Sequence, residues 1–96
     1  MAELVYELNK EKIVREDKYS FEKIKNELDN ILSRVGLTKK SEGVFEGDLE
    51  YAISAASRLM DLSWLMELFS VLKVQFIENG ESVYEDALEE YREGII

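Results

Sequence analysis

Residues 62–80 read LSWLMELFSVLKVQFIENG, and the way this stretch folds decides the fold of the whole chain. As far as Leu72, its only polar residues are spaced four and three apart: Ser63, Glu67 and Ser70. That spacing puts them on one narrow stripe of a helix that is otherwise apolar, and such a helix must be covered by the rest of the fold or by a second subunit. Because the apolar spacing continues to Asn79-Gly80, a natural helix stop, the pattern predicts a helix over 63–79.

The same stretch supports a rival interpretation, in which residues 73–78 form a strand. Asn79-Gly80 is then a hairpin turn, because this dipeptide readily adopts the positive φ angles of a two-residue turn. The residues after the turn favour a helix instead, since Ser82 and Glu85 match a capping box, in which each side chain satisfies the backbone N–H of the other residue. An apolar stripe at helical spacing follows, made of Val83, Ala87, Leu88 and Tyr91. We therefore expect a last helix over 83–94.

A second conflict lies upstream, over residues 44–54. Apolar and acidic residues alternate there as in a half-buried strand, but Asp48 can equally be the N-cap of a helix. Three alanines decide between the two, because alanine is the best helix former and is rare in strands: Ala52, Ala55 and Ala56. The expected element is a helix over 49–61.

The helix expected over 21–35 has no rival interpretation. Ser20 is a good N-cap, and Gly36 follows the last apolar position as the C′ residue, where glycine adopts a left-handed conformation at least cost. One apolar stripe runs between them at three- and four-residue spacing, formed by Phe21, Ile24, Leu28, Ile31, Leu32 and Val35.

The expected fold is mainly α, a compact bundle of about four helices in a single domain over residues 1–96. The helices are 21–35, 49–61, 63–79 and 83–94. An N-terminal strand or hairpin precedes them, because Leu4, Tyr6 and Leu8 alternate with other residues in a segment that also suits a frayed helix. The alternative is an α+β fold with strands near 3–8, 44–54 and 73–78.

Composition restricts the chemistry that the chain can carry out. It contains neither histidine nor cysteine, which excludes a Ser-His-Asp triad, disulfides, thiolate chemistry and nearly every zinc site. The remaining carboxylates fall opposite apolar stripes, where they face solvent. We therefore expect no enzyme activity and no catalytic, cofactor-binding or metal site. The N-terminus lacks the pattern of a signal peptide and no apolar run would span a bilayer, so we expect a soluble, cytoplasmic protein without a membrane partner.

The charge is distributed unevenly along the chain. Residues 1–43 carry nine acidic and nine basic residues, whereas residues 44–96 carry twelve acidic residues and three basic ones, which accounts for the whole net charge of −9. A field of one sign over one region governs partners more than it governs fold. A sequence pI near 4.5 opposes binding to phosphates, so we expect no direct binding of nucleic acid.

Two surfaces are candidates for function. The first is an apolar interface formed by Trp64, Leu65, Met66 and Phe69, and it would make the chain a small acidic protein-interaction module, homodimeric and without catalytic activity. The second is an acidic surface formed by Glu78, Glu81, Glu85, Glu89 and Glu93. It would make the chain an inhibitor or nucleic-acid mimic, of the immunity or anti-restriction type, that binds a basic protein partner.

Overall fold

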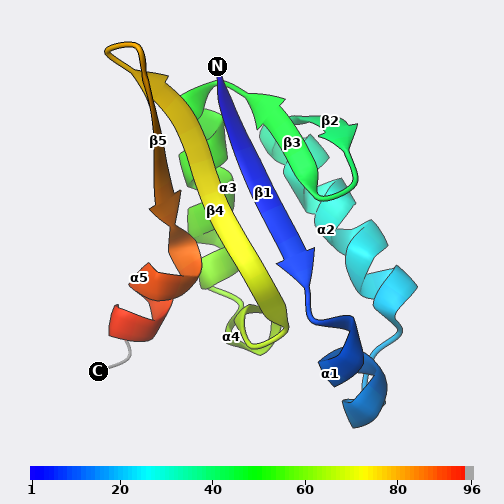
Figure 1. The fold of residues 1–96 in the computed structure, drawn as a ribbon. Helices are drawn as coiled ribbons and strands as arrows, with labels where there is room; N and C mark the ends of the chain where they lie inside the picture. Colours follow the sequence, from blue (N-terminus) through cyan, green and yellow to red (C-terminus); the bar gives the residue numbers. More distant parts are fainter. Residues whose placement is uncertain (95–96) are drawn as a thin grey trace.

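Residues 69–78 form the longest strand of a five-stranded antiparallel sheet, in a computed structural model that describes residues 1–94 (Figure 1). Five helices accompany the sheet. In chain order the elements are β1 (Ala2–Leu8), α1 (Lys10–Glu16), α2 (Phe21–Val35), β2 (Thr38–Ser41), β3 (Val44–Gly47), α3 (Leu49–Met60), α4 (Ser63–Met66), β4 (Phe69–Glu78), β5 (Glu81–Asp86) and α5 (Ala87–Gly94).

The fold is therefore α+β, and the expected four-helix bundle is wrong. Residues 63–79 do not form one helix, because α4 ends at Met66 and β4 begins at Phe69. Residues 83–94 are likewise divided between β5 and α5. The alternative with strands near 3–8, 44–54 and 73–78 is the better description, although only the first part of 44–54 is strand.

The error over 63–79 has a geometric cause. Residues four apart share a face in a helix and also in a strand, where every second residue does so. The spacing of Leu68, Leu72 and Phe76 therefore fits both structures. The burial pattern of β4 distinguishes the strand from the helix. Leu72 and Val74 are buried while Lys73 between them is only half-buried, and this alternation is the period of two of a strand.

The two helices that were expected between residues 21 and 61 are confirmed. α2 occupies Phe21–Val35, and Gly36 follows it with φ 112°, in the left-handed conformation that glycine tolerates. α3 begins after Asp48 and buries Ala52, Ala55 and Ala56. Both helices pack on the same face of the sheet, behind it in the view of Figure 1, and the small alanine side chains let α3 approach β1 and β4 closely.

The strands lie in the order β2-β3-β1-β4-β5, so β2 and β5 are the two edges of the sheet. As far as β4, the connectivity is the β-α-β-β-α-β arrangement known from ferredoxin-like domains, and β5 and α5 extend it at one side. This arrangement hosts many unrelated functions, so it does not by itself indicate one. Among residues 1–94, no helix is long and apolar enough to cross a membrane.

The core lies between the sheet and the helices. In β1, Leu4 and its neighbours on the same face are buried under α2 and α3, whereas Glu3, Val5 and Glu7 point to the opposite face. Among the described residues every buried side chain is apolar or aromatic, and the largest that are fully enclosed include Phe45, Leu28 and Leu59. The charged side chains of the described residues therefore lie at the surface of the molecule or are only partly buried.

Candidate functional site

The edge of the sheet formed by β5 is the first candidate site. β5 pairs with β4 on one side only, from Lys73 opposite Asp86 to Glu78 opposite Glu81. A two-residue turn joins the two strands, and Asn79 and Gly80 in it have φ angles of 52° and 79°. Positive φ at both positions is typical of the type I′ turn that favours tight hairpins. The hairpin interpretation of Asn79-Gly80 is thus the correct one.

The cap of α5 differs from the expected capping box. Ser82 and Glu85 both belong to β5, and the helix begins only after Asp86. The Asp86 carboxylate accepts hydrogen bonds from the backbone N–H groups of Leu88 and Glu89, at 3.0 and 3.2 Å. Asp86 is therefore the residue that ends the edge strand and starts the helix.

The five predicted acidic residues, which we call the acidic edge, are Glu78, Glu81, Glu85, Glu89 and Glu93. All five are exposed. The first two face each other across the hairpin, Glu85 lies near the end of β5, and the last two lie one turn apart on α5. They therefore follow one side of the molecule, from the tip of the hairpin to the C-terminal helix (Figure 1). Glu89 and Glu93 also line a surface hollow beside Ser70 and Arg92.

The charges of the acidic edge are not neutralised within the chain. Among residues 1–94, none of its five carboxylates forms an ion pair. The nearest bases in the sequence are Lys73 and Arg92. Lys73 lies on β4, the strand next to β5, with its ammonium 5.5 Å from the centre of the Tyr84 ring. The acidic edge is thus a source of negative potential toward solvent.

The opposite edge has a different electrostatic arrangement. On β2, the Lys39 ammonium contacts Asp29 at 3.0 Å and Glu42 at 3.2 Å, while Lys40 contacts Glu3 at 2.8 Å. Hydrogen bonds from Lys25 and Lys39 lower the pKa of the Glu42 carboxyl, and hydrogen bonds to carboxylates raise the pKa of both β2 lysines. Charges at the β2 edge are therefore matched by opposite charges from the same chain.

Sequence reasoning missed a polar contact beside this network. The Tyr6 hydroxyl, on β1, donates a hydrogen bond of 2.7 Å to Asp29 on α2. Burial, reinforced by the Asp29 carboxylate, raises the pKa of the Tyr6 phenol well above its ordinary value. Nothing in the sequence pattern linked these two residues, because the alternation in β1 indicated only that Tyr6 faces the core. The contact ties α2 to the sheet.

The candidate apolar interface is divided by the fold. Leu65, Met66 and Phe69 are only 2–3% exposed and pack inside the core, whereas Trp64 is 39% exposed. The apolar character of residues 62–72 is thus accounted for mostly by burial within the chain itself. The Trp64 ring lies 5.0 Å from the ring of Tyr19, centre to centre.

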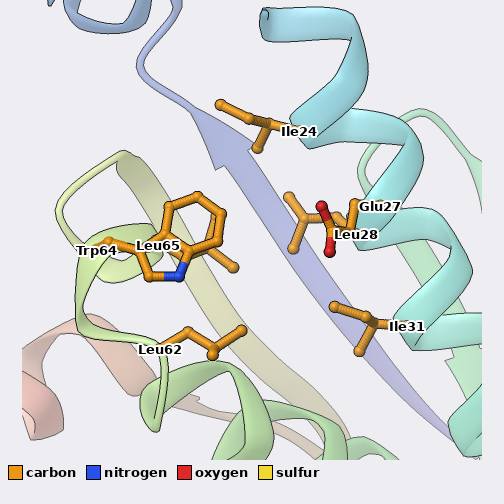
Figure 2. Close-up of a pocket in the computed structure, with 7 residues that line it drawn as sticks. All are labelled: Ile24, Glu27, Leu28, Ile31, Leu62, Trp64 and Leu65. Carbon is orange, nitrogen blue, oxygen red and sulfur yellow. The ribbon is translucent and has the colours of Figure 1, made fainter. Parts of the chain in front are cut away.

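Trp64 also borders a small apolar pocket between α2 and α4. Figure 2 shows its indole ring on the α4 side, across from Ile24 and Leu28 of α2. Ile31, Leu62 and Leu65 complete the apolar lining, and Glu27 is the one charged residue that borders it. The pocket offers contact area for an apolar group, but among its lining residues there is no arrangement of acid and base.

The carboxylates do not form a metal-binding cluster among the described residues. Within the part of the chain that the structure describes, no three Asp or Glu side chains converge as ligands of a metal ion would. No protein-family model matches the chain, and no curated protein or solved structure shows detectable similarity to it.

Proposed function

We propose that this chain is a small protein-interaction module, without catalytic activity, that binds a basic partner protein along its acidic edge. The observation that carries the proposal is that the two edges of the sheet differ in how their charges are paired. Lysines at the β2 edge have carboxylate partners in the chain, while the five carboxylates of the acidic edge have none among residues 1–94. A basic partner would supply the missing counter-charges, and complementary fields accelerate association.

The acidic edge also differs from an ordinary solvated helix face. Its acids lie on three consecutive elements, the end of β4, the edge strand β5 and the helix α5, and they accompany the exposed aromatic ring of Tyr84. Aromatic residues are enriched in protein interfaces, where they contribute large contact areas. An inhibitor that presents carboxylates where its target expects phosphates would use a surface of this kind. We further propose the cytoplasm as the place of action, which fractionation of cells expressing the tagged chain would test.

Capture experiments with matched charge variants test this proposal. One variant neutralises the acidic edge with Glu81→Gln, Glu85→Gln and Glu89→Gln, and its control removes three exposed acids elsewhere with Glu11→Gln, Glu16→Gln and Glu22→Gln. Basic host proteins should bind the wild type and the control but not the edge variant. They should also elute at about 1 M salt, where the Debye length falls to about 3 Å. Equal capture by both variants would contradict the proposal.

A second candidate function, homodimerisation, is favoured by one observation. Trp64, which borders the apolar pocket, and Tyr19 beside it are both exposed, although the other three residues of the expected interface are buried. Self-association through this surface predicts a dimer whose mass falls to that of a monomer in Trp64→Ala. Light scattering after gel filtration measures the mass of the wild type and of the variant. A wild-type monomer at micromolar concentration would eliminate this candidate.

A further inference from the structure

We propose that β5 accepts an extended, basic segment of a partner protein as a sixth strand of the sheet. This inference rests on the proposed function and specifies how the partner is held. It depends on three features of the molecule: the backbone groups that β5 presents, the contrast between the two edges, and the charges that select the occupant.

The first feature is the direction of the backbone groups in β5. In a two-residue hairpin the pair that closes the turn exchanges hydrogen bonds, and such pairs then alternate along the strands. From Glu78 opposite Glu81, the bonded positions on β5 are thus Glu81, Val83 and Glu85. The N–H and C=O groups of Ser82 and Tyr84 point the other way, to the open edge, where no described strand pairs with them.

The second feature is that β5 is the better of the two edges for strand addition. It has six residues in unbroken register with β4, whereas β2 has four residues and a register shift in its pairing with β3. The Tyr84 side chain, 64% exposed, stands next to the open edge and can pack against a residue of an added strand. Strand addition of this kind derives affinity from the main chain and specificity from alternate side chains.

Charge determines which strand can be added. If β5 paired antiparallel with β5 of a second copy about Val83, the open-edge groups of Ser82 would bond those of Tyr84, and each Glu81 would lie opposite Glu85. Like charges directly opposite each other are destabilising, so the acids act against self-pairing. Strand β2 of a second copy is also a poor occupant, because its lysines already contact Asp29, Glu42 and Glu3 of their own chain.

The remaining occupant is a strand from another, basic protein, and the spacing of β5 defines its pattern. Glu81 and Glu85 are four apart and project from the same face of the strand, while Tyr84 projects from the opposite face. A matching segment has Lys or Arg at alternate positions and apolar residues between them. Its cations would neutralise part of the acidic edge while its backbone pairs with Ser82 and Tyr84.

Two peptides of equal charge separate this mode of binding from simple charge attraction. The probe is Lys-Val-Lys-Val-Lys-Val-Lys, and the control is Lys-Pro-Lys-Pro-Lys-Pro-Lys, in which each proline lacks an N–H to donate. We expect the Lys-Val peptide to bind about tenfold more tightly, which is what two net backbone hydrogen bonds contribute. Titration calorimetry at low salt measures both affinities.

Each outcome has a distinct meaning. Equal, salt-sensitive affinities for the two peptides would overturn strand addition and leave the proposed function intact. Binding of neither peptide at low salt would overturn both. Slow exchange of the Tyr84 amide in the free protein, together with the mass of a dimer, would show that a second copy occupies the edge, and this too would overturn the inference.

A matched pair of variants locates the binding on β5. Ser82→Pro removes an N–H that points to the open edge, where proline is tolerated because no ladder bond is lost. Ser82→Ala removes the hydroxyl and keeps that N–H. We expect Ser82→Pro to lower the affinity for the Lys-Val peptide about threefold, because one of the two hydrogen bonds is lost, and Ser82→Ala to bind like the wild type.

Hydrogen exchange in the wild type gives a second readout, which does not require any variant to fold. The Ser82 and Tyr84 amides should exchange more slowly when the Lys-Val peptide is bound, and the Lys-Pro peptide should protect them much less. Unchanged exchange at both positions with the Lys-Val peptide bound would contradict strand addition at β5.

Discussion

The two edges of the sheet share one scaffold but treat their charges in opposite ways. At the β2 edge, lysines and carboxylates from α2, β1 and the β2–β3 turn pair with one another. At the β5 edge, the carboxylates stand along a hairpin and a helix and form no ion pair among the described residues. One edge thus has its charges paired within the chain, whereas the other carries carboxylates without such pairs among the described residues. Surface charge of the same kind is therefore arranged in two different ways on one sheet.

The largest difference in stability between the two edges should come from substituting the glycines of their hairpin turns. Gly43 has φ 74°, and a Cβ there would overlap the backbone oxygen of Tyr6, whereas Gly80 has φ 79° and open space around it. Gly43→Ala should therefore cost about 3 kcal/mol or more, from the left-handed conformation plus the overlap, and Gly80→Ala about 1 kcal/mol. Urea unfolding of both variants measures the difference, and equal costs would contradict the close packing inferred at the β2 edge.

The Tyr6–Asp29 contact should have the next largest effect. Tyr6→Phe deletes the hydroxyl that donates to Asp29, and we expect it to lower the free energy of unfolding by about 1–2 kcal/mol at neutral pH. Chemical denaturation of both proteins measures this loss. An unchanged stability would mean that the contact does not secure α2 to the sheet.

The same variant has a defined pH dependence. The pKa of Tyr6 is raised in the folded protein, so its contribution is fully present below the ordinary tyrosine pKa of about 10 and is lost as the pH rises above that value. The stability difference between wild type and Tyr6→Phe should therefore shrink above about pH 10. A difference that stays constant to higher pH would contradict the raised pKa.

Single charge substitutions should have the smallest effects, but of opposite sign at the two edges. Glu42→Gln removes a carboxylate that contacts Lys25 and Lys39, so its Tm should fall, by no more than about 3 °C because the pairs are exposed. Glu85→Gln relieves repulsion and should leave the Tm unchanged or raise it slightly. Added salt should diminish both shifts. Shifts of the same sign would remove the electrostatic distinction between the edges.

Some elements were predictable from local patterns. α2 was expected between the residues where it lies, because its N-cap, its apolar stripe and the glycine that ends it all lie within or next to the helix. The start of α5 carried a comparable signal. Asp86 precedes the first helical residue, Ala87, and Glu89 follows Asp86 three residues later, as in a capping box. The capping box at Ser82 concealed it, because the two patterns overlap.

The candidate sites, too, were predictable only in part. The five acids were expected on a surface and are exposed, since charged side chains are rarely buried. Their place at the open edge of a sheet could not be predicted once residues 83–94 were taken as one helix. Of the apolar candidates, Leu65 and Trp64 are adjacent in sequence and both apolar, yet Leu65 is only 2% exposed and Trp64 is 39% exposed. Only the position of α4 against α2 separates them.

The sequence by itself determined α2, the start of α3, the net charge and the absence of histidine and cysteine chemistry. The tertiary structure decided that residues 69–78 form a strand and that β5 is an edge. The physical reason is the range of the hydrogen bonds. A helix satisfies its backbone within four residues, so its signals are local. β4 satisfies its backbone through β1, where Val74 lies opposite Leu4, and such a partner becomes visible only when the chain has folded.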